Sequence, residues 1–261
     1  MKKVLAIVVL AAVMIGCAKV PITGRRQMKL LPEKNLIEMS KVQYKTFMDS
    51  VDVLPASDSR ALRVKTIGTN IQKSVEKWMG DNGFADRLEG FEWDFKTVKD
   101  PTINAWCMPG GKVCVYTGIM DLAEDDDMLA TVMGHEIAHA IARHGNERMS
   151  QQLALMGLGG LTGLTPSDSS ETSTVYQKVY MGSATLGILK FSRTHETESD
   201  KLGLVFMKMA GYKPEKAVEF WEKMANAGGA KPPEILSTHP HDETRIKDIK
   251  EFLPLIDDYI D

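Results

Sequence analysis

Two histidines in the stretch "VMGHEIAHAIARH", residues 132 to 144, are the first side chains in this sequence with a spacing suited to chemistry. His135 and His139 are four positions apart, so on an α-helix both imidazoles lie on one face and can point at one ion. Glu136 could take a proton from a water on that ion, as the glutamate of H-E-x-x-H metalloproteases does. The alternative is an ordinary helix, because a pattern with three fixed positions also occurs by chance.

Two histidines do not complete a catalytic zinc site, because such a site has three protein ligands and one open position. The stretch "SRTHETESD" at 192 to 200 supplies Glu196 as a candidate third ligand, with Asp200 one turn later. At this spacing the two carboxylates share a helix face. Glu196 can then reach the metal while Asp200 accepts a hydrogen bond from the far nitrogen of a ligand histidine. In isolation, these acidic residues would be interpreted as a hydrated helix face.

Taken together, "HEIAH" and the E-x-x-x-D of Glu196 and Asp200 resemble the gluzincin pattern, specifically the zinc metallopeptidase family of the CaaX prenyl protease and HtpX type. The stretches "PITGRRQMKL", "NAWCMPGGKVCVYTGIM" and "STHP" with Arg245 resemble the exported bacterial branch of that family. The resemblance runs from about Pro21 to Phe252. It implies a zinc-dependent endopeptidase with a single Zn²⁺ per chain. Ser199 departs from the usual pattern, in which alanine is common.

The resemblance also implies roles for single residues. Zinc would be held by His135, His139 and Glu196, Glu136 would be the general base and acid, and Asp200 would orient a ligand histidine. His239 is a further candidate ligand. In some exported relatives a histidine of the corresponding segment reaches the zinc, and His239 would likewise fill the open position and hold the enzyme inactive. It is otherwise an ordinary turn residue before a proline. The sequence leaves open the roles of His144, His195, Arg193, His241 and Arg245.

A small sheet is expected before the metal helix, because "FEWDFKTV" at 91–98 and "KVCVYTG" at 112–118 have strand-like patterns. If residues 109–112 form the turn of a hairpin, Cys107 faces Cys114, and either a disulfide or two unpaired thiols would fit there. The resemblance implies that the later strand is an edge on which an extended peptide docks by strand addition. Its substrate-binding residues would be Gly111, Lys112, Val113, Cys114 and Val115.

Apolar residues at helical spacing predict the helices that must position these side chains. Two helices are expected between residues 35 and 79, with a loop at "DSVDVLPASDS". The metal helix should start near the acidic run 124–127 and continue past Arg148. Later helices are expected at 194–209, after Pro214 and after "STHPHDET", with a polar loop at 157–174. The pattern predicts a mostly helical α+β fold with a small β-sheet or hairpin beside the HExxH helix, and the resemblance implies that this is a gluzincin-like domain.

The N-terminus has the order of a secretory signal, with Lys2 and Lys3 before an apolar run and then Gly16-Cys17. "MIGCAK" resembles a bacterial lipoprotein cleavage site, which would make Cys17 the lipidated residue. The expected division is a signal peptide at 1–16, a lipidated N-terminus and tether at 17–34, and a metallopeptidase domain at 35–261. Ala18 favours an outer-membrane lipoprotein facing the periplasm, by resemblance to sorting in Gram-negative bacteria. A secreted or inner-membrane-anchored periplasmic protein is the alternative.

The charge balance of the chain argues against nucleic acid as a partner. There are 32 Lys and Arg residues against 35 Asp and Glu, a formal net charge of -3, and no basic cluster interleaved with aromatic residues. By the resemblance, the expected substrates are unfolded or misassembled envelope proteins, and the membrane would be reached through the lipid anchor. A chaperone-like outer-membrane assembly factor that contains zinc but cleaves little is the alternative.

Overall fold

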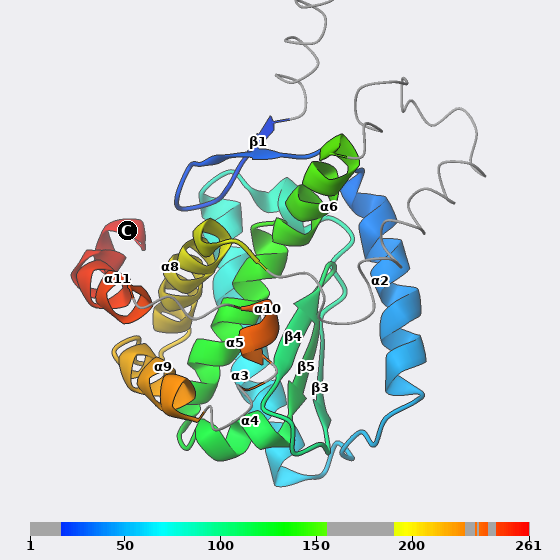
Figure 1. Ribbon diagram of the computed structural model, residues 1–261, viewed down its shortest axis with the longest axis vertical. Coiled ribbons are helices and arrows are strands. Elements are labelled where there is room, and N and C mark those ends of the chain that lie inside the picture. Colours follow the sequence, from blue (N-terminus) through cyan, green and yellow to red (C-terminus); the bar gives the residue numbers. More distant parts are fainter. Residues whose placement is uncertain (1–16, 156–190, 228–232, 234, 240–243, 261) are drawn as a thin grey trace, which may run out of the picture.

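A computed structural model describes residues 17–155, 191–227, 233, 235–239 and 244–260 (Figure 1). The expected signal peptide and the expected loop at 157–174 lie outside these residues. The expectation of a mostly helical α+β fold is confirmed. In chain order the elements are β1 (Cys17–Lys19), β2 (Arg26–Met28), α2 (Glu33–Met48), α3 (Ser59–Asp81), η1 (Ala85–Leu88), β3 (Asp94–Val98), β4 (Ala105–Met108), β5 (Lys112–Tyr116), α4 (Thr117–Leu122), α5 (Asp126–Ile141), α6 (His144–Leu155), α8 (Arg193–Met209), α9 (Lys216–Asn226), α10 (Ile235–Thr238), α11 (Arg245–Phe252) and η2 (Leu253–Tyr259).

Three short strands form a sheet in the order β3-β5-β4, beside the metal helix α5. β3 runs parallel to β5, whereas β4 runs antiparallel to it. Val113 of β5 is fully buried in the same core cluster as Ile137 of α5. On the opposite face of the sheet, Trp106 packs edge-on against Tyr44 and Phe47 of α2. Helices therefore lie on both sides of the sheet, and α5 is one of them (Figure 1).

The strand expected to be the substrate edge occupies the middle of the sheet, so that prediction was wrong. The predicted set Gly111 to Val115 falls on β5 and the turn before it, and β5 is paired with β3 on one side and β4 on the other. Both of its edges are therefore taken by existing strands. Within the described part of the chain, β4 pairs with β5 alone and is an edge strand of this sheet.

The turn between β4 and β5 is one residue shorter than expected, because Met108 pairs with Lys112, and this shifts the register by one residue. Cys107 pairs with Val113, whereas Trp106 pairs with Cys114. Gly110 and Gly111 adopt φ values of 87° and 79°, which residues with a side chain rarely adopt, so the two glycines permit this turn. Successive strand residues face opposite sides, so Cys107 and Cys114 lie on different faces of the hairpin as free thiols. A cross-strand disulfide is therefore ruled out.

Helices α5 and α8 cross at a pair of glycines, which brings the two halves of the metal site together. A Cβ atom on Gly203 would lie 2.9 Å from the carbonyl carbon of Gly134, and one on Gly134 would lie 3.0 Å from the Gly203 oxygen. The backbones can approach this closely only because both side chains are missing. The close approach places the first turns of α8 against the HEIAH stretch of α5.

The metal helix ends earlier than expected, because the chain breaks between α5 and α6. Arg143 adopts φ 59°, in the left-handed region. Its Nη2 donates to the Arg87 carbonyl oxygen at 3.2 Å, and its Nε lies 3.6 Å from Glu33 Oε2. The prediction of one helix continuing past Arg148 was therefore wrong. The break allows His144, the first residue of α6, to turn back toward His139.

The N-terminal segment at 18–31, expected to be part of a tether, packs against the domain. β1 and β2 pair antiparallel, and Val20 and Leu31 are 0% and 2% exposed. Gln27 is also buried, and its Nε2 donates to the Ala142 carbonyl oxygen at 2.8 Å. Lipidation of Cys17 stays a prediction. Among the described residues, the helices lack the combination of length and apolar character that a bilayer-spanning segment needs.

The remaining helices agree with the periodicity of the sequence. α2 and α3 lie on either side of the expected loop, and α8 covers the predicted span at 194–209. Ser192 caps α8 by accepting a hydrogen bond from the His195 backbone N–H at 3.2 Å, and Gly211 follows its end with φ 88°. The cap fixes the first turn of α8, which carries Glu196.

Candidate metal centre

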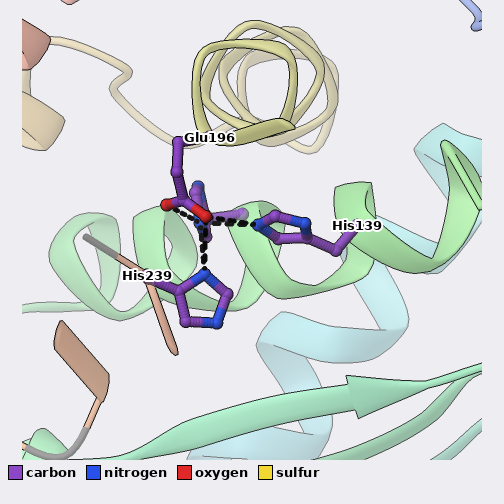
Figure 2. A group of neighbouring side chains, drawn as sticks. His139, Glu196 and His239 are labelled. Carbon is purple, nitrogen blue, oxygen red and sulfur yellow. Dashed lines mark hydrogen bonds and ion pairs between the residues drawn. The ribbon is translucent and has the colours of Figure 1, made fainter. Parts of the chain in front are cut away.

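Four buried side chains, from two helices and the segment after α10, point their donor atoms at one region (Figure 2). His135 and His139 come from α5, Glu196 from α8 and His239 from the segment just after α10, and one donor atom from each lies within 4.8 Å of the others. Figure 2 shows Glu196 descending from α8 toward His139 and His239. The structure thus brings together the three ligands that the sequence suggested and the fourth candidate, His239.

The donor atoms are spaced as ligands of a small tetrahedral ion. His135 Nε2 lies 3.0 Å from His139 Nε2 and 3.3 Å from His239 Nδ1. Glu196 Oε1 lies 3.1 Å from His239 Nδ1 and 3.5 Å from His139 Nε2. Zinc bonds of about 2.0–2.1 Å in a tetrahedron place neighbouring ligands about 3.3–3.4 Å apart. Three imidazole nitrogens and one carboxylate oxygen are also ligands that zinc prefers, so the site fits zinc.

Helix geometry explains why the two α5 ligands converge. Residues four apart lie on the same face, and the rings of His135 and His139 have centroids 4.7 Å apart. Glu196 is in the first turn of α8, which Gly134 and Gly203 hold close to α5. The site is therefore formed by one helix face and one closely packed helix start.

The far nitrogen of His135 has a dedicated acceptor. His135 Nδ1 lies 2.9 Å from Asp200 Oδ1, one turn beyond Glu196 on α8. Arg245 donates from Nη2 to the same oxygen at 2.6 Å, and its guanidinium carbon lies 3.3 Å from the centroid of the Trp221 ring. Asp200 thus favours the tautomer in which His135 carries its proton on Nδ1 and leaves Nε2 free for the metal. Arg245, whose role the sequence left open, holds Asp200 in place.

Glu136 is in position to act as a base next to the donor group. It is 3% exposed, and its Oε1 lies 3.5 Å from His239 Nε2 and has no hydrogen-bond partner among the described residues. Burial raises the pKa of Glu136 above its usual value, while His239 and His135 lower it. A carboxylate with a raised pKa can both accept and release a proton near neutral pH.

Burial and neighbouring groups together determine the charge of two ligands. Burial lowers the pKa of His139 well below its usual value, which keeps the ring neutral as a metal ligand must be. For Glu196, burial opposes ionisation, but His239 and hydrogen bonds from His135 and His139 lower its pKa well below the usual value. The donor group therefore presents a carboxylate to the metal.

A second buried cluster lies behind the metal ligands, and the sequence did not identify it. His144 Nδ1 lies 2.9 Å from His139 Nδ1, and His144 Nε2 lies 3.1 Å from Glu198 Oε2. Arg25 reaches both Glu198 and Glu147 from the N-terminal segment. Burial lowers the pKa of His144 to about 4, although the hydrogen bond with Glu198 acts to raise it. The position of His144 five residues after His139 was the one available signal in the sequence.

The sheet edge nearest the site is β4. Tyr116 N donates to the Asn104 carbonyl oxygen at 3.1 Å. In an antiparallel pair, every second residue exchanges backbone hydrogen bonds with the partner strand. The backbone N–H and C=O groups of Trp106 and Met108 therefore point toward β5, whereas those of Ala105 and Cys107 point away from it. Burial raises the pKa of the Cys107 thiol, and the charge of Glu136 raises it further. The Cys107 thiol of β4 is therefore within electrostatic reach of Glu136.

Comparison with known proteins agrees with this geometry. Residues 68–253 match the model of Peptidase family M48. The chain is 30% identical to the mitochondrial metalloendopeptidase OMA1 of Saccharomyces cerevisiae, over 90% of this chain and 69% of that protein. It is 30% identical to the human mitochondrial metalloendopeptidase OMA1, over 90% of this chain and 45% of that protein.

A bacterial relative is the beta-barrel assembly-enhancing protease of Escherichia coli, 27% identical over 78% of this chain and 48% of that protein. The chain thus spans less than half of the human and Escherichia coli relatives that it matches. The match to the family model includes all four donor residues and Glu136. The chain therefore belongs to Peptidase family M48 and is a zinc metalloendopeptidase.

Proposed function

We propose that this protein is an endopeptidase of the bacterial cell envelope that cleaves misfolded or misassembled periplasmic and outer-membrane proteins. The observation that carries the proposal is the position of Glu136, which is buried next to a complete set of zinc ligands and whose Oε1 has no hydrogen bond from the described part of the chain. When bound, zinc would polarise the peptide carbonyl and make a water more acidic. Glu136 would take the proton of that water and pass it to the leaving amine.

Among the described residues no strand pairs with the outer side of β4, and this supports a preference for unfolded substrates. Backbone groups of Ala105 and Cys107 point away from β5 and can pair with an extended peptide. Only a segment without its own fold can add to a sheet edge in this way. The backbone of the docked peptide would pass near Glu136. A peptide bond, rather than a side chain, would then lie at the zinc site.

His239 supports a latent form of the enzyme. With His239 Nδ1 among the donors, zinc would have four protein ligands, and a catalytic zinc site needs an open position. The other ring nitrogen of His239 lies 3.5 Å from Glu136 Oε1, in the region that a water would need. We infer that His239 leaves the donor group before peptide is cleaved.

The envelope location is supported by the expected secretory signal and the lipoprotein cleavage site expected before Cys17. It is also supported by the bacterial relatives, which are named beta-barrel assembly-enhancing proteases. The mitochondrial relatives carry the name metalloendopeptidase and share the same peptidase family. An outer-membrane lipoprotein facing the periplasm is the form that this sequence favours.

The test uses the full chain anchored in outer-membrane lipid vesicles and one β-barrel protein presented either unfolded or folded. The proposal predicts cleavage of the unfolded form, loss of cleavage with a zinc chelator, and little cleavage of the folded barrel. Equal cleavage of both forms would contradict a quality-control role.

A zinc-containing assembly factor with little proteolysis is the second candidate, and the four-ligand site favours it. This candidate predicts faster barrel folding without cleavage products, and the same vesicle experiment detects both outcomes.

A further inference from the structure

Arg25 lies far from the metal ligands in the sequence, but three hydrogen bonds, through Glu198 and His144, connect its side chain to His139. Its Nε donates to Glu198 Oε1 at 2.8 Å, and its Nη2 donates to Glu198 Oε2 at 2.8 Å. Thr23 Oγ1 donates to Glu198 Oε1, also at 2.8 Å. Glu198 is 4% exposed, so these donors from the N-terminal segment fix a buried carboxylate.

The carboxylate of Glu198 determines which nitrogen of His144 carries the proton. His144 Nε2 lies 3.1 Å from Glu198 Oε2, and a carboxylate that already accepts from Arg25 and Thr23 can only accept here as well. His144 therefore donates from Nε2. Its Nδ1 is left as an acceptor, and His139 Nδ1 lies 2.9 Å away.

The proton on His139 Nδ1 in turn leaves His139 Nε2 free for zinc. If His144 were protonated on Nδ1 instead, it would donate to His139 Nδ1, and the neutral His139 ring would carry its proton on Nε2, where the metal must bind. His135 needs no such relay, because its Nδ1 lies directly against Asp200 Oδ1. The two helix ligands are thus oriented by different routes.

We propose that Arg25 is a positioning residue of the zinc centre, which acts through Glu198 and His144 to orient His139. Arg25 lies outside residues 68–253, the part that matches the family model, so the N-terminal segment completes a site carried by the rest of the domain. The inference rests on the zinc centre and does not require that the protein degrade envelope proteins.

Glu147 provides a matched control within the same cluster. It is 3% exposed, and Arg25 donates to its two oxygens at 2.7 Å and 2.6 Å. Its histidine partner is His195, with Nε2 3.1 Å from Glu147 Oε2, and His195 is outside the donor group. Glu147→Gln therefore removes a comparable buried charge beside Arg25 while it leaves the bonds from Arg25 to Glu198, from Glu198 to His144 and from His144 to His139 in place.

The experiment measures Zn²⁺ affinity of the full chain by competition with a chelator, in wild type and in Arg25→Met, Arg25→Lys, Glu198→Gln, Glu147→Gln and Arg26→Met. Loss of such an orienting partner weakens metal binding about 10–100-fold, which is the result expected for Arg25→Met and Glu198→Gln. Arg25→Lys keeps the charge but not the forked donors, so an intermediate loss is expected. Glu147→Gln and Arg26→Met, the latter an exposed neighbour, should stay within about twofold of wild type.

Nitrogen-15 NMR of the histidine rings in the same proteins reports the tautomers directly. His144 should carry its proton on Nε2 in wild type and Glu147→Gln, and a mixture should appear in Glu198→Gln, since a glutamine can either donate or accept. Glu198→Gln also covers the case in which Arg25→Met fails to fold. Equal zinc affinity in Glu198→Gln and wild type, or equal losses in Glu198→Gln and Glu147→Gln, would overturn the proposal. Because no readout depends on cleavage, the result stands even if the protein cleaves nothing.

Discussion

His239 Nδ1 lies 3.3 Å from His135 Nε2, although 104 positions separate the two residues in the chain. The same nitrogen lies 3.1 Å from Glu196 Oε1. If His135, His139 and Glu196 hold zinc, His239 Nδ1 would take the position that a catalytic zinc ion keeps for water and substrate, as proposed above. Removal of this side chain should uncover whatever activity the site can support.

His239→Ala is expected to raise kcat/KM for an unfolded protein substrate. If the open state makes up about a tenth of the wild-type population, the gain is about tenfold. Zinc content should remain near one ion per chain, because His135, His139 and Glu196 remain. A variant that keeps its zinc but cleaves no faster than wild type would show that His239 does not block the site.

Cys107→Pro is expected to raise KM for extended peptides and to leave zinc binding unchanged. The backbone N–H of Cys107 points away from β5 and could bond to a docked strand. Proline has no N–H, so the variant loses this hydrogen bond. Cys107→Ala is the matched control, because it removes the thiol but keeps the N–H. Similar KM values for the two variants would mean that peptide does not dock on β4.

Gly203→Ala is expected to destabilise the domain by about 1–3 kcal/mol and to weaken zinc binding. The new Cβ would lie 2.9 Å from the Gly134 carbonyl carbon, so α8 must move away from α5 and take Glu196 and Asp200 with it. Gly80→Ala in α3 is the control, because a Cβ there meets nothing within 4 Å. Thermal unfolding and zinc titration measure the two effects. Unchanged zinc affinity in Gly203→Ala would contradict this account of the helix crossing.

Acid should remove the stabilisation that Glu147 provides. Burial opposes its charge, but hydrogen bonds from Arg25 and His195 lower the pKa of Glu147 well below its usual 4.5. A carboxyl with a lowered folded-state pKa stabilises the fold above the unfolded pKa and loses that effect as pH falls toward the folded value.

Glu147→Gln should therefore be less stable than wild type at pH 7, by about 1–3 kcal/mol in urea unfolding. The difference should shrink as the pH falls below about 4. A stability difference that stays constant from pH 7 to pH 3 would argue against an ionised Glu147 in the folded protein.

The helices and the convergence of the α5 and α8 side chains could be predicted because both depend on local spacing. The four-residue period of His135 and His139, and again of Glu196 and Asp200, determines which side chains share a helix face. The periodicity also located α2, α3 and α8.

The errors arose where long-range pairing or backbone strain decides the structure. A strand pattern does not say whether a strand is central or at an edge, so β5 was assigned to the wrong place. The break at Arg143 depends on contacts with Glu33 and Arg87, which are distant in sequence. The link from Arg25 to His139 depends on those same long-range arrangements, and no short motif contains it.

The most direct test of the zinc peptidase compares casein cleavage by wild type and Glu136→Gln, both as the fragment beginning at Lys19, with bound zinc measured in each. Glu136 is outside the donor group, so the variant should bind as much zinc as wild type. It should cleave at least about 100-fold more slowly, because it has lost its proton acceptor. A chelator should stop the wild-type enzyme. Equal cleavage by the two zinc-loaded proteins would contradict the account, because the site would then work without its base.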